Sequence, residues 1–138
     1  MRHLSEIIRH QNPLTLPPGA TVKHACERMR DRRVGAVLVI DNEHRLLGIF
    51  TGRDAITRVL AEGKNAAHTT LADVMTREPS TLPPGKTAIE ALRLMQECGC
   101  RHVPVVEGDK VVGVLSKGDF RGTEQDRLDE ETGIWERI

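Results

Sequence analysis

An internal repeat constrains this chain more than any other feature. Residues 15–19 read Thr-Leu-Pro-Pro-Gly, and the same five residues return at 81–85. The residues after each copy are also similar, and both repeats end on phrases of one kind, Gly-Ile-Phe-Thr-Gly-Arg-Asp at 48–54 and Gly-Val-Leu-Ser-Lys-Gly-Asp at 113–119. Such repeats indicate similar units that each bury too little alone, so we expect them to pack together and leave crevices for a ligand.

Composition limits the classes of function. The 138 residues are 38% hydrophobic and 29% charged, which suits one soluble body of two halves. No apolar run approaches the roughly 20 residues that span a bilayer, and the N-terminus lacks the apolar stretch of a signal peptide. We therefore expect a cytoplasmic protein with no membrane partner. The net charge of zero and the 2% aromatic content argue against a nucleic-acid partner, which needs clustered basic residues or stacking surfaces.

Apolar spacing predicts the same order of elements in each repeat, and so an α/β (α+β) fold. A short helix precedes an extended segment, and a longer helix with Thr21 or Thr87 as its N-cap precedes two strands and a last helix. The expected short helices are 4–8 and 71–75, the longer ones begin at 22 and 88, the strands are 36–40, 46–50, 103–106 and 111–115, and the last helix of the first repeat is 54–62. Pro104 lacks an N–H, so we expect an open side on its strand.

We expect three parts: a first repeat over 1–66, a second over 67–122 and a charged tail over 123–138. Gly122 interrupts the last helix of the second repeat early. The tail holds Trp135, the single tryptophan of the chain, and its apolar residues favour docking on this protein or a partner over fraying.

The three cysteines do not suggest a disulfide framework, because their number is odd and the chain looks cytoplasmic. Cys98 and Cys100 stand near His102, but the spacing matches no common zinc pattern and a fourth ligand would have to come from elsewhere. We expect small buried thiols here and no metal, with a metal- or redox-responsive role as a weaker alternative.

The order of elements, the closing phrases and the Arg-His-Val-Pro-Val-Val stretch at 101–106 resemble the CBS domain, named for cystathionine β-synthase. Two copies make a tandem pair, called a Bateman module, over about residues 1–122. The resemblance implies two repeats packed with pseudo-twofold symmetry, a homodimer, and clefts between the repeats that bind adenosine ligands such as AMP, ADP, ATP, NAD-type cofactors or S-adenosylmethionine. It also implies two sets of ligand-binding residues. The first set is Leu14, Val34, Gly35, Ala36, Thr51, Arg53 and Asp54, and the second set is Ser80, Cys100, Arg101, His102, Ser116 and Asp119.

The residue types fit this chemistry. A carboxylate can accept hydrogen bonds from both ribose hydroxyls, and a hydroxyl beside helix N–H groups suits a phosphate. The same Ser/Thr-x-x-Asp pattern is also an ordinary helix cap, but a cap alone does not explain the Gly-apolar-apolar residues before it. The two sets differ, because Arg53 corresponds to Gly118, while Arg101 and His102 correspond to Gly35 and Ala36. His102 is either a sensor of pH or phosphate charge or a packed polar residue.

No catalytic motif is present: the chain has no phosphate-binding P-loop and no His-Glu-x-x-His, and none of its serines stands in a Gly-x-Ser-x-Gly context. We therefore expect no enzyme and no catalytic cofactor, but a regulatory module with an adenine nucleotide as its ligand and a partner protein as its target. The alternative is a ligand-free scaffold for protein interaction and dimerisation.

Overall fold

The computed structural model describes residues 2–120. Gly122 and the tail with Trp135, including its expected docking, lie outside these residues. The described chain forms two compact units. The first-repeat unit comprises residues 12–79 and 109–111, and the second-repeat unit comprises 2–11, 80–108 and 112–120.

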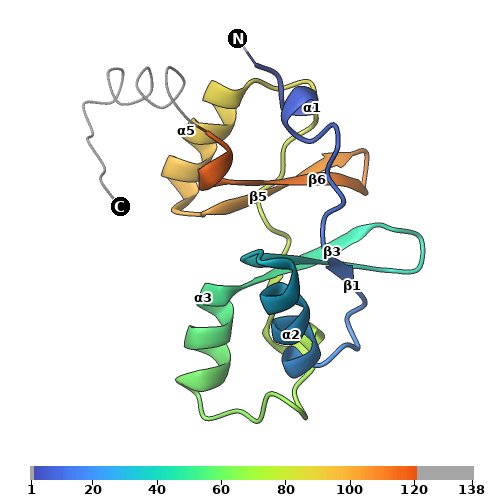
Figure 1. The fold of residues 1–138 in the computed structure, drawn as a ribbon, viewed down its shortest axis with the longest axis vertical. Coiled ribbons are helices and arrows are strands. Elements are labelled where there is room, and N and C mark those ends of the chain that lie inside the picture. Colours follow the sequence, from blue (N-terminus) through green and yellow to red (C-terminus); the bar gives the residue numbers. More distant parts are fainter. Residues whose placement is uncertain (1, 121–138) are drawn as a thin grey trace. The chain divides into compact units, whose positions relative to one another are not determined.

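The first-repeat unit contains a four-stranded sheet in the order β1-β2-β3-β4, with β1 parallel to β2 and the other two pairs antiparallel. Its apolar helix faces and strands bury a common core that includes Val22, Val37, Phe50, Val59 and Leu71. Figure 1 shows α2 and α3 beside the β2–β3 hairpin. The elements are β1 (Thr15–Leu16), α2 (Val22–Arg32), β2 (Ala36–Ile40), β3 (Leu46–Thr51), α3 (Gly52–Asp54), η1 (Ala55–Leu60), α4 (Leu71–Val74) and β4 (Thr76–Arg77).

The second-repeat unit is built around the two-stranded sheet of β5 and β6. Its core includes Leu4, Leu92, Met95, Val105 and Leu115. Helices α1 and α5 lie beside the β5–β6 hairpin in Figure 1. The elements are α1 (Leu4–Ile7), α5 (Ala88–Cys98), β5 (His102–Glu107), β6 (Lys110–Ser116) and η2 (Lys117–Asp119).

The compact units do not coincide with the repeats, because each repeat gives its opening segment to the other unit. The Leu71 N–H of α4 donates to the carbonyl of Ala20 at 2.9 Å, and the Leu4 N–H of α1 donates to the carbonyl of Lys86 at 2.9 Å. Leu71 and Leu4 are both fully buried. The division at residue 66 thus marks the sequence repeat, whereas the hydrophobic cores place residues 2–11 with the second repeat and 67–79 with the first.

The predicted helix starts are confirmed at α2 and α5. The Thr21 side chain accepts a hydrogen bond from the His24 N–H at 3.1 Å, and Thr87 accepts one from the Glu90 N–H at 3.3 Å. The Glu90 carboxylate contacts the Thr87 hydroxyl at 3.2 Å. These side chains satisfy backbone donors that a first helical turn would otherwise leave unpaired.

The last helix of the first repeat differs from the expected span of 54–62. It begins at Gly52, and from Ala55 to its end at Leu60 it is a π-helix. The Thr57 hydroxyl donates to the Arg53 carbonyl at 2.8 Å. In an α-helix this carbonyl would accept from the backbone N–H of Thr57. Threonine bonding of this kind competes with the helix ladder, which gives a local reason for the wider turn.

The two sheets differ at their edges. In the first-repeat unit, β4 pairs with β3 through the backbone. In the second-repeat unit, the Gln11 side-chain amide donates to the Val114 carbonyl and accepts from the Val114 N–H, both at 2.9 Å. On β5, the Pro104 carbonyl accepts from the Leu82 N–H at 3.2 Å. The N and O of one residue point to the same side of a strand, so the missing Pro104 N–H removes no hydrogen bond to β6. The expectation of an open side is wrong here, because Leu82 pairs with Val105 on that side.

Candidate functional site

Most residues of the first predicted set gather where β2 begins and β3 ends. The two strands pair Ala36 with Thr51, and the Gly52 N–H donates to the Gly35 carbonyl at 3.1 Å. Asp54 follows within the same turn. The exposed members of the set are Val34, Gly35 and Arg53.

Asp54 is buried and its carboxylate is fully engaged. Its side chain and that of Thr51 form a capping box, in which Oδ2 accepts from the Thr51 N–H at 3.0 Å. Oδ1 accepts from the Thr76 hydroxyl at 3.3 Å and lies 3.5 Å from the Arg58 Nε. Arg58 also donates to the Met75 carbonyl at 3.1 Å. With 7% of the residue exposed, Asp54 joins the closing phrase to the segment around β4.

Arg58 and Thr76 are absent from the predicted site. Arg58 stands four residues after Asp54, a spacing that favours a helical ion pair, so a local signal existed. Thr76 lies 22 residues beyond Asp54, and only the pairing of β3 with β4 brings it close. No local pattern could have indicated this contact.

The second set gathers in the equivalent place on β5 and β6. The Lys117 N–H donates to the Arg101 carbonyl at 3.1 Å, as the Gly52 N–H does to Gly35 in the first set. Asp119 Oδ2 accepts from the Ser116 N–H at 2.7 Å and lies 3.3 Å from the Ser116 hydroxyl. Asp119 is half-buried. Within residues 2–120, no hydrogen bond or ion pair reaches its other carboxylate oxygen, in contrast to Asp54.

Arg2 also reaches this site, and no sequence pattern indicated it. Its guanidinium donates to the Asp119 backbone carbonyl at 3.0 Å across 117 residues of chain. The contact follows from the packing of residues 2–11 in the second-repeat unit. Arg2 therefore adds a positive charge beside the second set.

The first extended segments of the two repeats differ in one hydrogen bond. In the first, the Leu38 N–H donates to the Leu14 carbonyl at 2.9 Å. The equivalent residues are Pro104 and Ser80, and proline has no N–H to donate. Ser80 is exposed, and no donor among the described residues reaches its carbonyl. The Ser80 carbonyl of the second set is therefore available as a backbone acceptor, whereas the equivalent Leu14 carbonyl is bonded to β2.

His102 begins β5 and is half-buried. Burial lowers the pKa of His102 below its usual 6.5, the negative charge of Asp119 opposes this shift, and the positive charge of Arg101 adds to it. Desolvation disfavours the charged imidazolium, so the neutral form is favoured in the folded protein.

This environment predicts a pH dependence of stability. The unfolded chain binds a proton on His102 more readily than the native protein does, so stability contributed by neutral His102 is present above about pH 6.5 and falls as the pH drops toward the native pKa. His102→Asn should reduce this slope. Urea unfolding of the wild type and the variant between pH 5 and 8 measures the effect, and equal slopes would contradict it.

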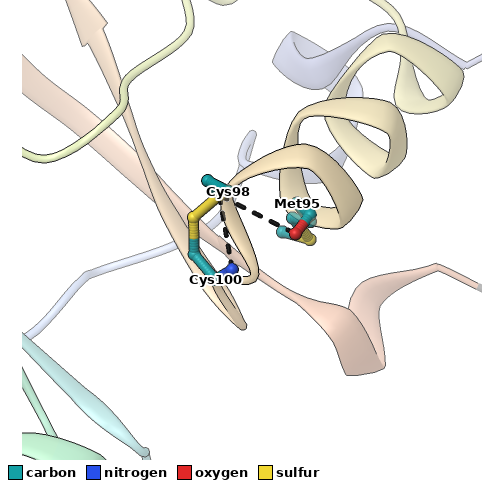
Figure 2. Close-up of a disulfide and its surroundings, with 3 residues drawn as sticks. All are labelled: Met95, Cys98 and Cys100. Atoms are coloured by element: carbon teal, nitrogen blue, oxygen red, sulfur yellow. Dashed lines mark hydrogen bonds between the residues drawn. A yellow bond between two sulfur atoms is a disulfide. The ribbon is translucent and has the colours of Figure 1, made fainter.

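The structure corrects the expectation of free thiols at the end of α5. Cys98 and Cys100 form a disulfide, with their Cα atoms 5.3 Å apart. The bond closes a loop of three residues, and Figure 2 shows it near the Met95 carbonyl. Cys26 keeps a free, half-buried thiol, and burial raises the pKa of that thiol. An odd number of cysteines does not favour a framework of several disulfides. A single bond between two nearby cysteines is compatible with an odd number.

Residues 2–120 contain neither a metal-ligand cluster nor a membrane-spanning helix. In this part of the chain, no group of three or more His, Cys, Asp or Glu side chains is arranged to hold a metal ion. No helix among the same residues has the length and apolar character required to cross a membrane.

Comparison with known proteins agrees with the repeated architecture. The family model of the CBS domain matches twice, at residues 4–61 and 71–124. The CBS domain-containing protein CBSCBSPB2 of Arabidopsis thaliana is 45% identical over 108 residues, which are 78% of this chain and 20% of that protein. The chain thus spans about a fifth of the length of the first curated relatives that it matches.

Two solved structures share the fold over most of their length. A CBS domain protein from Pyrobaculum aerophilum complexed with AMP has a TM-score of 0.82 and 25% identity, covering 93% of this chain and 98% of that one. A CBS-domain containing protein from Agrobacterium tumefaciens has a TM-score of 0.78 and 26% identity, covering 85% and 94%. The chain belongs to the CBS domain family and carries two copies of the domain in tandem.

Proposed function

We propose that this protein is a regulatory module that binds an adenosine-containing ligand, and that the second set of residues holds it. The observation that carries the proposal is the half-buried carboxylate of Asp119, which uses one oxygen in the turn at Ser116 and keeps the other for a ligand. Ribose hydroxyls are suitable donors to such an oxygen. The AMP complex of the Pyrobaculum aerophilum protein supports the ligand class.

The other members of the second set supply the remaining contacts in this proposal. The exposed Arg101 and the Ser116 hydroxyl are suited to a phosphate, since guanidinium groups bind phosphate through paired hydrogen bonds. The Ser80 carbonyl, which Pro104 leaves without a strand partner, can accept a hydrogen bond from the adenine amino group. His102, with its pKa lowered by burial, contributes a neutral imidazole between these groups.

The first set is a weaker candidate. Asp54 already accepts bonds on both oxygens, and Arg58 and Thr76 lie against the oxygen that would face a ribose. A ligand there would have to displace these partners at a cost in free energy. We therefore propose one nucleotide per chain, held by the second set, with the first set serving chiefly to support its fold.

The proposal includes no catalytic step. Binding would regulate a partner protein by favouring one arrangement of the chain or its homodimer over another, which requires different affinities for the two arrangements. Ile56 and Leu60 support self-association: they stand one helical turn apart with 61% and 74% of their surface exposed. The same pair favours the second candidate, a ligand-free dimerisation scaffold.

Calorimetric titration of the full chain with AMP, ADP, ATP, NADH and S-adenosylmethionine tests the proposal. We expect at least one of them to bind with one site per chain. The matched control is 2′,3′-dideoxy-AMP, which lacks both ribose hydroxyls. Losing two hydrogen bonds to a carboxylate should weaken its binding by about 100-fold relative to AMP if AMP is the ligand.

The outcomes separate the two candidates. If none of the five compounds binds while sedimentation shows a stable dimer, the scaffold is correct and the nucleotide module is wrong. Two sites of equal affinity per chain would contradict the assignment to the second set alone.

A further inference from the structure

The disulfide between Cys98 and Cys100 lies in the segment that leads into the second set. Cys98 is the last residue of α5, Gly99 caps the helix with a φ of 67°, and Cys100 is itself a member of the set. The bond closes only three residues, and constraining so short a loop removes little entropy from the unfolded chain. It is therefore a poor device for stabilising the fold as a whole.

The first repeat makes the same turn without a disulfide. Arg33 has a φ of 55° and occupies the place of Gly99. The Val34 N–H donates to the Met29 carbonyl at 3.1 Å, just as the Cys100 N–H donates to the Met95 carbonyl at 3.2 Å. The backbone of this turn can therefore form without the sulfur bridge, and opening the bridge is compatible with an intact fold.

The bridge is also placed to control the neighbouring ligand residues. The Cys98 sulfur lies 3.3 Å from the Cys100 N–H, so both ends of the bridge hold the backbone just ahead of Arg101. The Arg101 carbonyl is bonded to the Lys117 N–H, two residues before Asp119. Restraining the turn restrains the residues on which a nucleotide would rest.

We propose that Cys98 and Cys100 form a redox-active pair, whose oxidised state orders residues 100–102 and strengthens nucleotide binding by the second set. The nucleotide part of this inference rests on the proposed function. Ordering a binding segment beforehand reduces the entropy lost on binding. On that basis, the oxidised chain should bind the nucleotide about threefold to tenfold more tightly than the reduced chain.

The chemistry is a thiol–disulfide exchange with an external dithiol. A thiolate of the dithiol attacks the sulfur of Cys98, the more exposed residue of the pair, and the Cys100 sulfur leaves with the bonding electron pair and takes up a proton. The second thiolate of the dithiol then attacks the mixed disulfide and releases Cys98 as a thiol, also after protonation. The protein gains two electrons and two protons, and the dithiol becomes a cyclic disulfide. In the reduced state the Cys98 thiol has the Met95 carbonyl oxygen 3.7 Å away as an acceptor.

The test uses the full chain with Cys26→Ser, which leaves only the two cysteines of the pair. The protein is equilibrated with mixtures of oxidised and reduced dithiothreitol, and the disulfide is counted by mass spectrometry after alkylation. Hydrogen exchange is then measured on peptides covering 98–102 and 116–119, and AMP is titrated by calorimetry in both states. The control carries Cys98→Ser and Cys100→Ser in addition and should behave identically in both reagents.

We expect a reversible disulfide, slower exchange in residues 100–102 when it is formed, and tighter AMP binding in that state. A pair that never oxidises in the buffer series, or exchange that is the same in both states, would overturn the redox pair. AMP binding of equal strength in both states would overturn its control of the site. Redox-dependent exchange without AMP binding in either state supports the ordering of the segment and counts against the proposed nucleotide function alone.

Discussion

Asp119→Ala should weaken nucleotide binding by about 100-fold or more, whereas Asp54→Ala should change it by less than about threefold. Hydrogen bonds to a charged group contribute about 1.5–3 kcal/mol each, and two ribose hydroxyls would lose theirs in the Asp119 variant. Asp54 is engaged by Thr51, Thr76 and Arg58, so its removal costs stability instead, by about 2 kcal/mol. Calorimetry with the ligand found in the titration series and urea unfolding measure the two effects.

The two variants control for each other, because they remove the equivalent aspartate from the two closing phrases. If Asp54→Ala abolishes binding and remains as stable as the wild type, the roles of the two carboxylates are reversed from those proposed. The Asp119→Ala variant must also show cooperative unfolding, because this control shows that the variant is folded and that its weaker binding is not caused by a loss of structure. Binding that survives in the Asp119 variant at full strength would contradict the site.

Gly48→Ala should destabilise the protein by about 3 kcal/mol. A Cβ at this position would lie 2.7 Å from the Thr76 carbonyl oxygen and 2.8 Å from the Met75 sulfur. The oxygen belongs to the backbone of β4, which pairs with β3 at this point. Overpacking of a well-filled interior costs about 1–3 kcal/mol, and a backbone atom has less freedom to move away than a side chain has.

The matched control for this substitution is Gly19→Ala. No atom lies within 4 Å of a Cβ at Gly19, and its φ is not in the left-handed region. Replacing such a glycine should leave stability unchanged or raise it by up to about 1 kcal/mol. Urea unfolding of both variants measures the difference, and a Gly48→Ala protein as stable as the control would show that β4 does not pack where the structure places it.

This crowding explains a feature of the closing phrases that capping alone leaves unexplained. At the equivalent Gly113, a Cβ would lie 2.6 Å from the Ile8 side chain, which belongs to the segment received from the other repeat. Both glycines of the Gly-apolar-apolar pattern therefore admit a neighbouring segment. In both copies the glycine of the phrase leaves room for a neighbouring segment, whereas the carboxylate at the end of the phrase has different partners in each copy.

Much of the fold could be predicted from the sequence, because helices and strands follow from local patterns. The apolar residues of 22–29 recur at helical spacing, and residues 36–40 form a continuous apolar run rich in β-branched side chains; both elements are present as predicted. Thr21 and Thr87 also cap their helices as expected. The residues after Asp54 form a helix, but its π-helical turns depend on a hydroxyl contact that periodicity does not report.

The sequence predicts which residues belong to the candidate site, but it does not predict most of the interactions that these residues make. The strand pairing and turns gather most of each set, because the closing phrase follows directly on the hairpin. The contacts of Thr76 with Asp54 and of Arg2 with Asp119 join residues 22 and 117 positions apart. Such contacts depend on which segments pack into each hydrophobic core. The repeat in the sequence does not indicate that residues 2–11 pack with the second repeat and residues 67–79 with the first.

The amino-acid sequence alone determined the duplicated order of elements and the family, since both rest on periodicity and on short motifs that can be read locally. Tertiary structure decided what the two copies do with the same phrase. Arg58 and Thr76 surround the carboxylate of the first copy, whereas one oxygen of Asp119 in the second has no such partner among the described residues. The physical reason is that a carboxylate takes its role from the donors around it, and packing, not chain order, brings those donors close.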